Sequence, residues 1–201
     1  MRRNFFNRTH FDNPKSKKQH GVTTFDFIIW GGLALIIVFG LVTLALKGRS
    51  KVSSFSETTE LPLVFQGVQN TYNTQADYTG ATLDTVARGQ VWRPSEVTIP
   101  SSGSATVTDQ FGGAVTLGVG TITTSNDIAQ LNYKNYPSAE CANVVNAVGG
   151  IVRRVYVDST NSGTADAGIL VKPDGGSINP TSLNSACSGS NLNSITYDIG
   201  H

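Results

Sequence analysis

The sequence predicts an α+β protein, in which a long N-terminal helix, part of it transmembrane, packs on a globular head with an antiparallel β-sheet. Three observations lead to this fold class. Residues 27–46 contain no charged side chain. Apolar residues then recur at helical spacing from Leu61 to Tyr72. From residue 105 onward the pattern changes to short alternating segments separated by Gly-rich turns, which is typical of strands.

The apolar run is long enough to span a membrane. About 20 residues at a rise of 1.5 Å cover the hydrocarbon core of a bilayer. The run is longer than the core of a secretory signal peptide and no A-x-A-like cleavage site follows it, so we expect it to be retained as an anchor. We assign residues 22–46 to this transmembrane helix.

Charge is distributed unevenly around the predicted span. Residues 1–21 are strongly basic, whereas the remainder of the chain carries more acids than bases. By the positive-inside rule the N-terminus is cytoplasmic, and the head lies on the other side of the membrane. The head shows no basic stripe, so we expect no direct nucleic-acid site.

A single carboxylate, Asp26, stands at the start of the span. An acid inside an apolar helix is costly and is by default a functional candidate. The plain alternative is an interfacial acid that the dipole of the helix N-terminus stabilises without any partner. Both interpretations remain open on the residues alone.

The stretch G-V-T-T-F-D at residues 21–26 resembles the prepilin-peptidase site of type IV prepilins. The resemblance implies that the leader 1–21 is removed after Gly21, that Val22 becomes an N-methylated N-terminus, and that Asp26 is the acid of the mature helix. The family usually has Glu there, and Asp is one methylene shorter. The long leader and a first residue other than Phe resemble the type IVb branch, which includes toxin-coregulated and conjugative pilus pilins.

A physical argument accounts for such an acid. Cleavage creates a positive amine at Val22, and this amine enters apolar surroundings when helices bundle. An unpaired charge there is expensive, whereas the carboxylate of a neighbouring subunit compensates it and sets the axial register. We therefore expect Asp26 to pair with the Val22 amine of another copy.

The helix is expected to continue beyond the membrane through residues 47–75. Basic residues at 47–51 mark the membrane exit. One apolar face follows, formed by Leu61, Val64, Phe65, Val68 and Tyr72. Pro62 is expected to begin or kink this part of a helix that runs from about residue 24 to residue 74.

Residues 76–201 are expected to form the head. A short helix is predicted within 79–88, and Trp92 is predicted to be a core residue in an extended connection. Strands are predicted at 114–119, 121–123, 128–133, 152–157, 169–171 and 195–199. A helix is predicted from Ser138 as N-cap to Gly149-Gly150, with Cys141, Val144, Val145 and Val148 on its buried face.

The two cysteines, Cys141 and Cys187, most simply form one disulfide in an exported head, which would stabilise it by about 4 kcal/mol. Two free thiols are the alternative, and a redox role is conceivable because Cys141 lies near a helix N-terminus, although no CxxC is present. Residues 139–149 and 183–189 resemble the two cysteine segments of type IVb pilins. That resemblance implies that residues 141–187 form the exposed, variable surface of a filament.

The residues for catalysis are scarce. Two of the three histidines lie in the leader and the third is His201, so a Ser-His-Asp arrangement or a metal site has little material in the head. We read Asp158, Asp166 and Asp174 as solvated surface charges. We expect no enzymatic activity, no metal and no cofactor.

These observations lead to a structural function. We expect a type IVb pilus subunit, anchored in the bacterial inner membrane with a periplasmic head before assembly and extracellular afterwards. The resemblance implies further copies of the chain, a prepilin peptidase, an assembly ATPase and an inner-membrane platform protein as partners. The alternatives are a monomeric, single-pass anchored binding or sensing domain, and a minor pilin or pseudopilin of a secretion system. The sequence does not decide whether such a pilus serves adhesion, aggregation, conjugation or DNA uptake.

Overall fold

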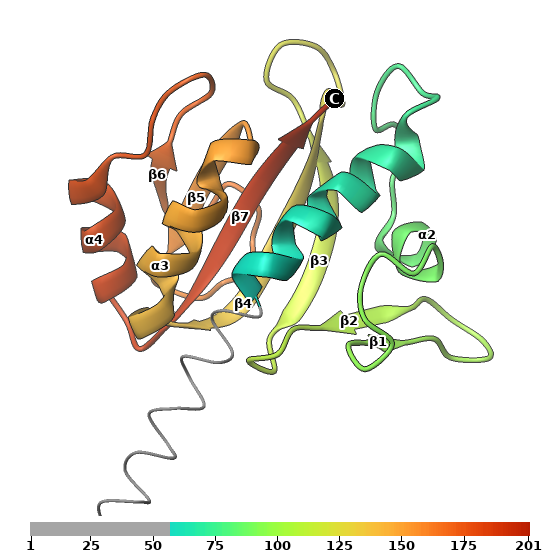
Figure 1. Ribbon diagram of the computed structural model, residues 1–201, viewed down its shortest axis with the longest axis horizontal. Coiled ribbons are helices and arrows are strands. Elements are labelled where there is room, and N and C mark those ends of the chain that lie inside the picture. Colours follow the sequence, from blue (N-terminus) through green and yellow to red (C-terminus); the bar gives the residue numbers. More distant parts are fainter. Residues whose placement is uncertain (1–56) are drawn as a thin grey trace, which may run out of the picture. The chain divides into compact units, whose positions relative to one another are not determined.

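The computed structural model describes residues 57–201 (Figure 1). It begins with a helix over residues 57–72, which we call the leading helix. The other elements are α2 (Leu83–Arg88), β1 (Val97–Thr98), β2 (Thr106–Thr108), β3 (Ala114–Gly120), β4 (Ile128–Pro137), α3 (Ser138–Val148), a short 3-10 turn (Gly149–Ile151), β5 (Arg154–Asp158), β6 (Ile169–Lys172), α4 (Pro180–Ser188) and β7 (Leu192–Gly200).

The strands form one seven-stranded sheet in the order β1-β2-β3-β4-β7-β5-β6, and every neighbouring pair is antiparallel. β7 follows the other six strands in sequence but lies between β4 and β5. The predicted α+β class with an antiparallel sheet is therefore confirmed.

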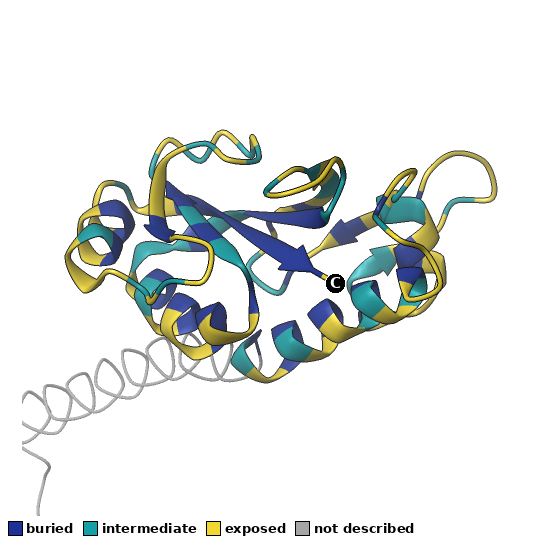
Figure 2. Cartoon of the chain, turned by 90° about the horizontal axis from the view of Figure 1, so that it is seen from above, coloured by how far each residue is buried: buried dark blue, intermediate teal, exposed yellow. Residues whose placement is uncertain are grey.

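The leading helix and α3 cover the same face of the sheet (Figures 1 and 2). All five apolar residues of the predicted stripe are buried. Phe65 packs on Tyr197 of β7 with ring centroids 5.2 Å apart, which places the leading helix against the middle of the sheet. The helical period of the sequence therefore identified the packed face correctly.

Pro62 does not begin the helix. The chain is already helical from residue 57, and the helix continues through Pro62 to residue 72. A proline lacks the N–H that an interior helical position donates, so tertiary packing overrides the local preference here. The flanking residues Leu61 and Val64 are almost completely buried, which holds the helix on the sheet at this point.

The opposite face of the sheet is polar yet largely buried. Along β7, Thr196 and Asp198 alternate with the apolar residues of the helix-covered face. Asn132 Nδ2 donates to Thr196 Oγ1 at 2.8 Å, and Gln130 Nε2 donates to Asp198 Oδ1 at 3.1 Å. Gln130 Nε2 also donates to Asp166 Oδ1 at 2.8 Å, which brings the β5–β6 connection onto this face.

Several head elements differ from the prediction. Residues 121–123 are not a strand, because the Asp127 carboxylate accepts the backbone N–H groups of Ile122, Thr123 and Thr124 and holds them in a turn. Ser138 is the first helical residue of α3 instead of its N-cap, which is Pro137. The short strands β1 and β2 and the helix α4 were not predicted. The short helix within 79–88 and the buried Trp92 are confirmed.

Candidate functional site

The two cysteines form the disulfide Cys141–Cys187, with Cα atoms 5.7 Å apart. It joins α3 to α4 across 46 residues of sequence, and both residues are buried. No free cysteine occurs in the described part of the chain, so the alternative of two free thiols is wrong.

The helix α4 carries the second cysteine and owes its start to local chemistry. The Asn179 side chain accepts the N–H groups of Thr181 and Ser182 at 3.0 and 3.1 Å, and Pro180 occupies the first turn, where no N–H is needed. Leu183, Ala186 and Cys187 form its buried side. The disulfide therefore fastens two short helices that each have a narrow apolar stripe.

Asp158 contradicts its interpretation as a solvated surface charge. It is buried at the end of β5, where Thr160 and Ser162 both donate to its carboxylate from hydroxyl and backbone N–H groups. Burial alone would raise the pKa of Asp158, but these donors lower it to about 2. The residue acts as an internal anchor for the β5–β6 connection.

Asp174 is exposed but paired. Arg153 Nη2 lies 2.8 Å from Asp174 Oδ2, and Arg153 Nη1 lies 3.4 Å from Asp127 Oδ2. The guanidinium thus joins the β6–α4 connection to the β3–β4 turn. Asp166, which is also exposed, accepts from Gln130 and lies 3.9 Å from Arg154 Nη2.

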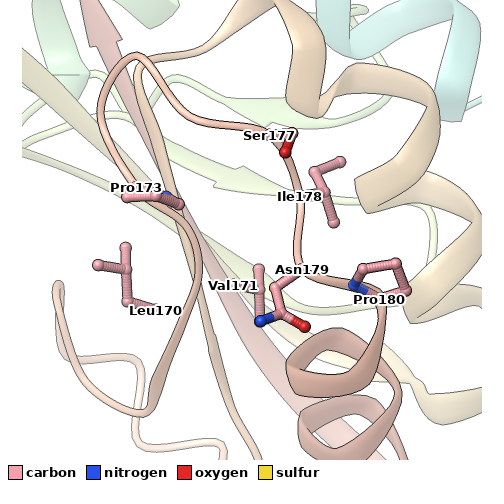
Figure 3. Close-up of a pocket in the computed structure, with 7 residues that line it drawn as sticks. All are labelled: Leu170, Val171, Pro173, Ser177, Ile178, Asn179 and Pro180. Carbon is pink, nitrogen blue, oxygen red and sulfur yellow. The ribbon is translucent and has the colours of Figure 1, made fainter.

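An open groove of about 540 Å³ lies between the edge strand β6 and the start of α4 (Figure 3). Its lining is mostly apolar and consists of Leu170, Val171, Pro173, Ser177, Ile178, Asn179 and Pro180. Leu170 and its neighbour Ile169 are each about two-fifths exposed, at 40% and 43%. The disulfide-bounded region 141–187 thus presents an apolar surface at the edge of the sheet.

A second apolar surface lies beside the leading helix. Leu63 is the most exposed large apolar residue of the described chain, at 61%, and it borders a groove of about 250 Å³ with Val91 and Trp92. A neighbouring groove of about 290 Å³ continues past Trp92 to the exposed Ile99. One side of the leading helix therefore packs on the sheet, while Leu63 on the other side is exposed beside these grooves.

Sequence reasoning missed a group of acids beneath the start of the leading helix. Glu57 and Glu60 are buried and lie close to Glu96 and Asp109 around one small cavity. The signal was present: Glu57, Glu60 and Val64 are spaced three and four residues apart, so both acids extend the apolar stripe that was recognised from Leu61 onward.

The proposed processing residues Gly21, Val22 and Asp26 lie outside the described residues, as do the leader and the predicted span. Among residues 57–201, no helix is long and apolar enough to cross a membrane. The same residues contain no group of three His, Cys, Asp or Glu side chains that could hold a metal ion.

Comparison with solved structures identifies pilin folds. The chain resembles a type IVb pilin from Salmonella typhi with a TM-score of 0.52 and 17% identity, over 73% of this chain and 99% of that one. TcpA, a type IV pilin from Vibrio cholerae El Tor, matches with a TM-score of 0.48 and 16% identity, over 73% of this chain and 98% of that one. A comparison with curated proteins finds no match.

The family described as PilS N terminal matches residues 51–199, which is most of the chain and nearly all of its head. The matched residues include the leading helix, both cysteines of the disulfide and β7 up to residue 199. The chain belongs to the PilS N-terminal family, and its head has the fold of a type IVb pilin.

Proposed function

We propose that the chain is the precursor of a structural subunit of a type IVb pilus, which is extracellular once assembled. The observation that carries this proposal is the leading helix, which packs its apolar face on the pilin-type sheet and leaves Leu63 exposed on the opposite side. A helix that packs on its own head in this way still has an exposed side with which to contact another copy. Membership of the PilS N-terminal family supports the same conclusion.

The proposed maturation begins at the sequence G-V-T-T-F-D. A prepilin peptidase cleaves after Gly21, Val22 is N-methylated, and residues 22–46 anchor the subunit in the inner membrane with its head in the periplasm. An assembly ATPase and a platform protein then move the subunit into the filament. There Asp26 neutralises the Val22 amine of a neighbouring copy, which allows both charges to enter an apolar helix bundle.

N-terminal sequencing and intact-mass measurement of the membrane-bound chain test the maturation step. We expect a mature chain that starts at Val22 and carries one additional methyl group. A Gly21→Val variant should remain uncleaved and serves as the control. A wild-type chain that retains residues 1–21 in the membrane would favour the anchored binding or sensing domain over a pilus subunit.

The role of Asp26 is tested by the amount of this chain in sheared surface filaments. We expect Asp26→Ala to be processed normally but to lose most filament assembly, because the buried amine then has no counter-charge. Asp26→Glu keeps the charge and should retain assembly. Normal filament levels for Asp26→Ala would contradict the proposed pairing, and absence of the wild-type chain from filaments would contradict the pilus function itself.

A further inference from the structure

Four carboxyl groups meet beneath the first turns of the leading helix. Glu57 and Glu60 come from the helix itself, Glu96 precedes β1, and Asp109 directly follows β2. Together with Trp92, Tyr133, Leu61 and Val64 they line one cavity of about 10 Å³, roughly the space of a single water molecule. Glu57, Glu60 and Asp109 are 4%, 9% and 7% exposed. We call these four residues the acid cluster.

The positive charge near the acid cluster is small. Arg93 Nη2 lies 2.6 Å from Glu60 Oε2, and this is the one ion pair that the acid cluster makes with the described residues. Gln110 Nε2 donates to Glu57 Oε2 at 2.6 Å but carries no charge. Like charges that share a poorly solvated site repel each other, so one guanidinium cannot balance four ionised carboxylates.

Only one of the two carboxylate oxygens of Asp109 has hydrogen-bond partners among the described residues. Its Oδ1 accepts the N–H groups of Phe111 and Gly113 at 2.9 and 2.7 Å. Its Oδ2 is buried and has no hydrogen-bond partner among the described residues. A buried carboxylate oxygen without a donor is costly, and a proton bound to the carboxyl group lowers this cost because it removes the buried charge.

The phenols that face the acid cluster add no charge. Tyr133 and Tyr136 of β4 and Tyr197 of β7 are buried, and burial raises the pKa of each well above its usual value. The pKa values of the carboxyl groups are raised, so these groups keep their protons to a higher pH than usual. Burial is the main cause, and it raises the pKa of Asp109 to about 6 and that of Glu57 to about 7.

Glu96 completes the group. Its partial burial, together with the adjacent Glu60, raises the pKa of Glu96 to about 8. The folded head therefore keeps protons within the acid cluster at a pH where ordinary carboxyl groups have released theirs.

We propose that the acid cluster is a proton-binding latch: bound protons hold the first turns of the leading helix on the head, and their release loosens those turns. The position of the cavity limits this loosening to the part of the helix that borders it. Leu61 and Val64 line the same cavity as the four acids, whereas Val68 and Tyr72 pack further along the helix and do not border it. This inference goes beyond the proposed pilus function, because it concerns the contact between helix and head within one subunit.

Hydrogen exchange of the full-length chain in detergent micelles tests the latch. The measured quantity is the protection of amides in residues 57–64 relative to residues 68–72, at about pH 6 and about pH 8.5, after correction for intrinsic exchange. We expect this ratio to fall about tenfold or more as the pH rises, since a pKa displaced by one unit corresponds to a factor of ten. A ratio that stays constant or rises would overturn the proposal.

Glu57→Gln and Glu96→Gln are the test variants, because an amide imitates the shape of a protonated carboxyl group. Each should retain high protection of residues 57–64 at the higher pH. Asp174→Asn is the matched control: the Arg153 side chain lowers the pKa of Asp174, so this acid does not titrate in the range tested. The proposal fails if both Gln variants follow the wild-type pH profile. If neither variant folds, the wild-type profile alone decides.

Discussion

The carboxylate of Asp158 accepts hydrogen bonds from four donor groups of two residues, the hydroxyl and backbone N–H groups of Thr160 and Ser162. The connection that follows it toward β6 has few buried apolar side chains of its own. The Asp158 carboxylate therefore holds the first residues of this connection, while Gln130 holds Asp166 further along it. Hydrogen bonds to charged groups are among the stronger ones, and donors left without an acceptor lose the most.

We expect Asp158→Ala to lower the free energy of unfolding by about 2 kcal/mol, because the hydroxyl and N–H donors lose their acceptor. Urea unfolding of the purified chain measures this change. Asp158→Asn keeps one carbonyl oxygen and should cost less than the alanine variant. Equal stabilities for Asp158→Ala and the wild-type chain would show that the carboxylate does not organise this connection.

At the scale of elements, the leading helix has one side that packs on the head and one side that is exposed to solvent. Leu61 is buried against the sheet, whereas Leu63, two residues later, points to solvent. The same substitution at these two positions therefore separates packing on the head from contacts with other molecules, while the change in helix propensity is the same for both.

We expect Leu61→Ala to destabilise the head by about 3 kcal/mol, because it removes buried methyl groups and leaves a cavity. Leu63→Ala should change the free energy of unfolding by less than about 0.5 kcal/mol. Denaturant titrations of both variants give the comparison. A large loss for Leu63→Ala would show that its exposed position does not describe the chain in solution.

The disulfide is the second feature of element scale, because it joins α3 and α4 directly. Replacing both cysteines by alanine should cost about 4 kcal/mol, chiefly through the added freedom of the unfolded chain. Thermal unfolding with and without reductant provides the measurement, with the double alanine variant as the reductant-insensitive control. A wild-type chain that unfolds identically under both conditions would contradict this expectation.

For the whole molecule, two groups of acids act on stability in opposite directions. Glu57, Glu96 and Asp109 have raised pKa values, so the folded state binds protons more tightly than the unfolded state, and stability falls as the pH rises through about 4 to 8. Asp127 and Asp158 have a pKa lowered to about 2, so the stability that they provide is present above about pH 4 and is lost as the pH falls toward 2.

We therefore expect the free energy of unfolding to be greatest at about pH 4 to 5 and to decrease by about 2 kcal/mol or more toward pH 9. Urea titrations over this range check the curve. Glu57→Gln should flatten its neutral side, whereas Asp158→Asn should lower the curve above about pH 4 by a constant amount and change its slope only on the acid side. A maximum above pH 7 would contradict the assignment of raised pKa values to the acid cluster.

The sequence predicted those parts of the molecule that a local period encodes. The buried stripe of the leading helix and the buried face of α3 follow from residues three and four apart, and both are confirmed. The place of β7 in the middle of the sheet could not be predicted, because strand order depends on contacts distant in sequence. α4 was missed because only three of its nine residues are buried.

The candidate site also contains parts that the sequence predicted and parts that only the fold brings together. The pairing of Cys141 with Cys187 was expected and is confirmed. The acid cluster was overlooked because Glu57 and Glu60 read as polar residues, although their spacing continues the stripe. Its other members, Glu96 and Asp109, come together only through the fold. Gly21, Val22 and Asp26 remain predictions.

The central position of β7 has a consequence for how the head comes to be folded. Its partners β4 and β5 lie on either side of it, and they do not pair with each other. During folding, the two halves of the sheet are therefore joined only when β7 pairs with both of them, through contacts that are distant in sequence. Such pairings form slowly, so the edges of β4 and β5 stay unpaired early in folding. A protein that shields those edges would raise the yield of folded heads without altering their stability.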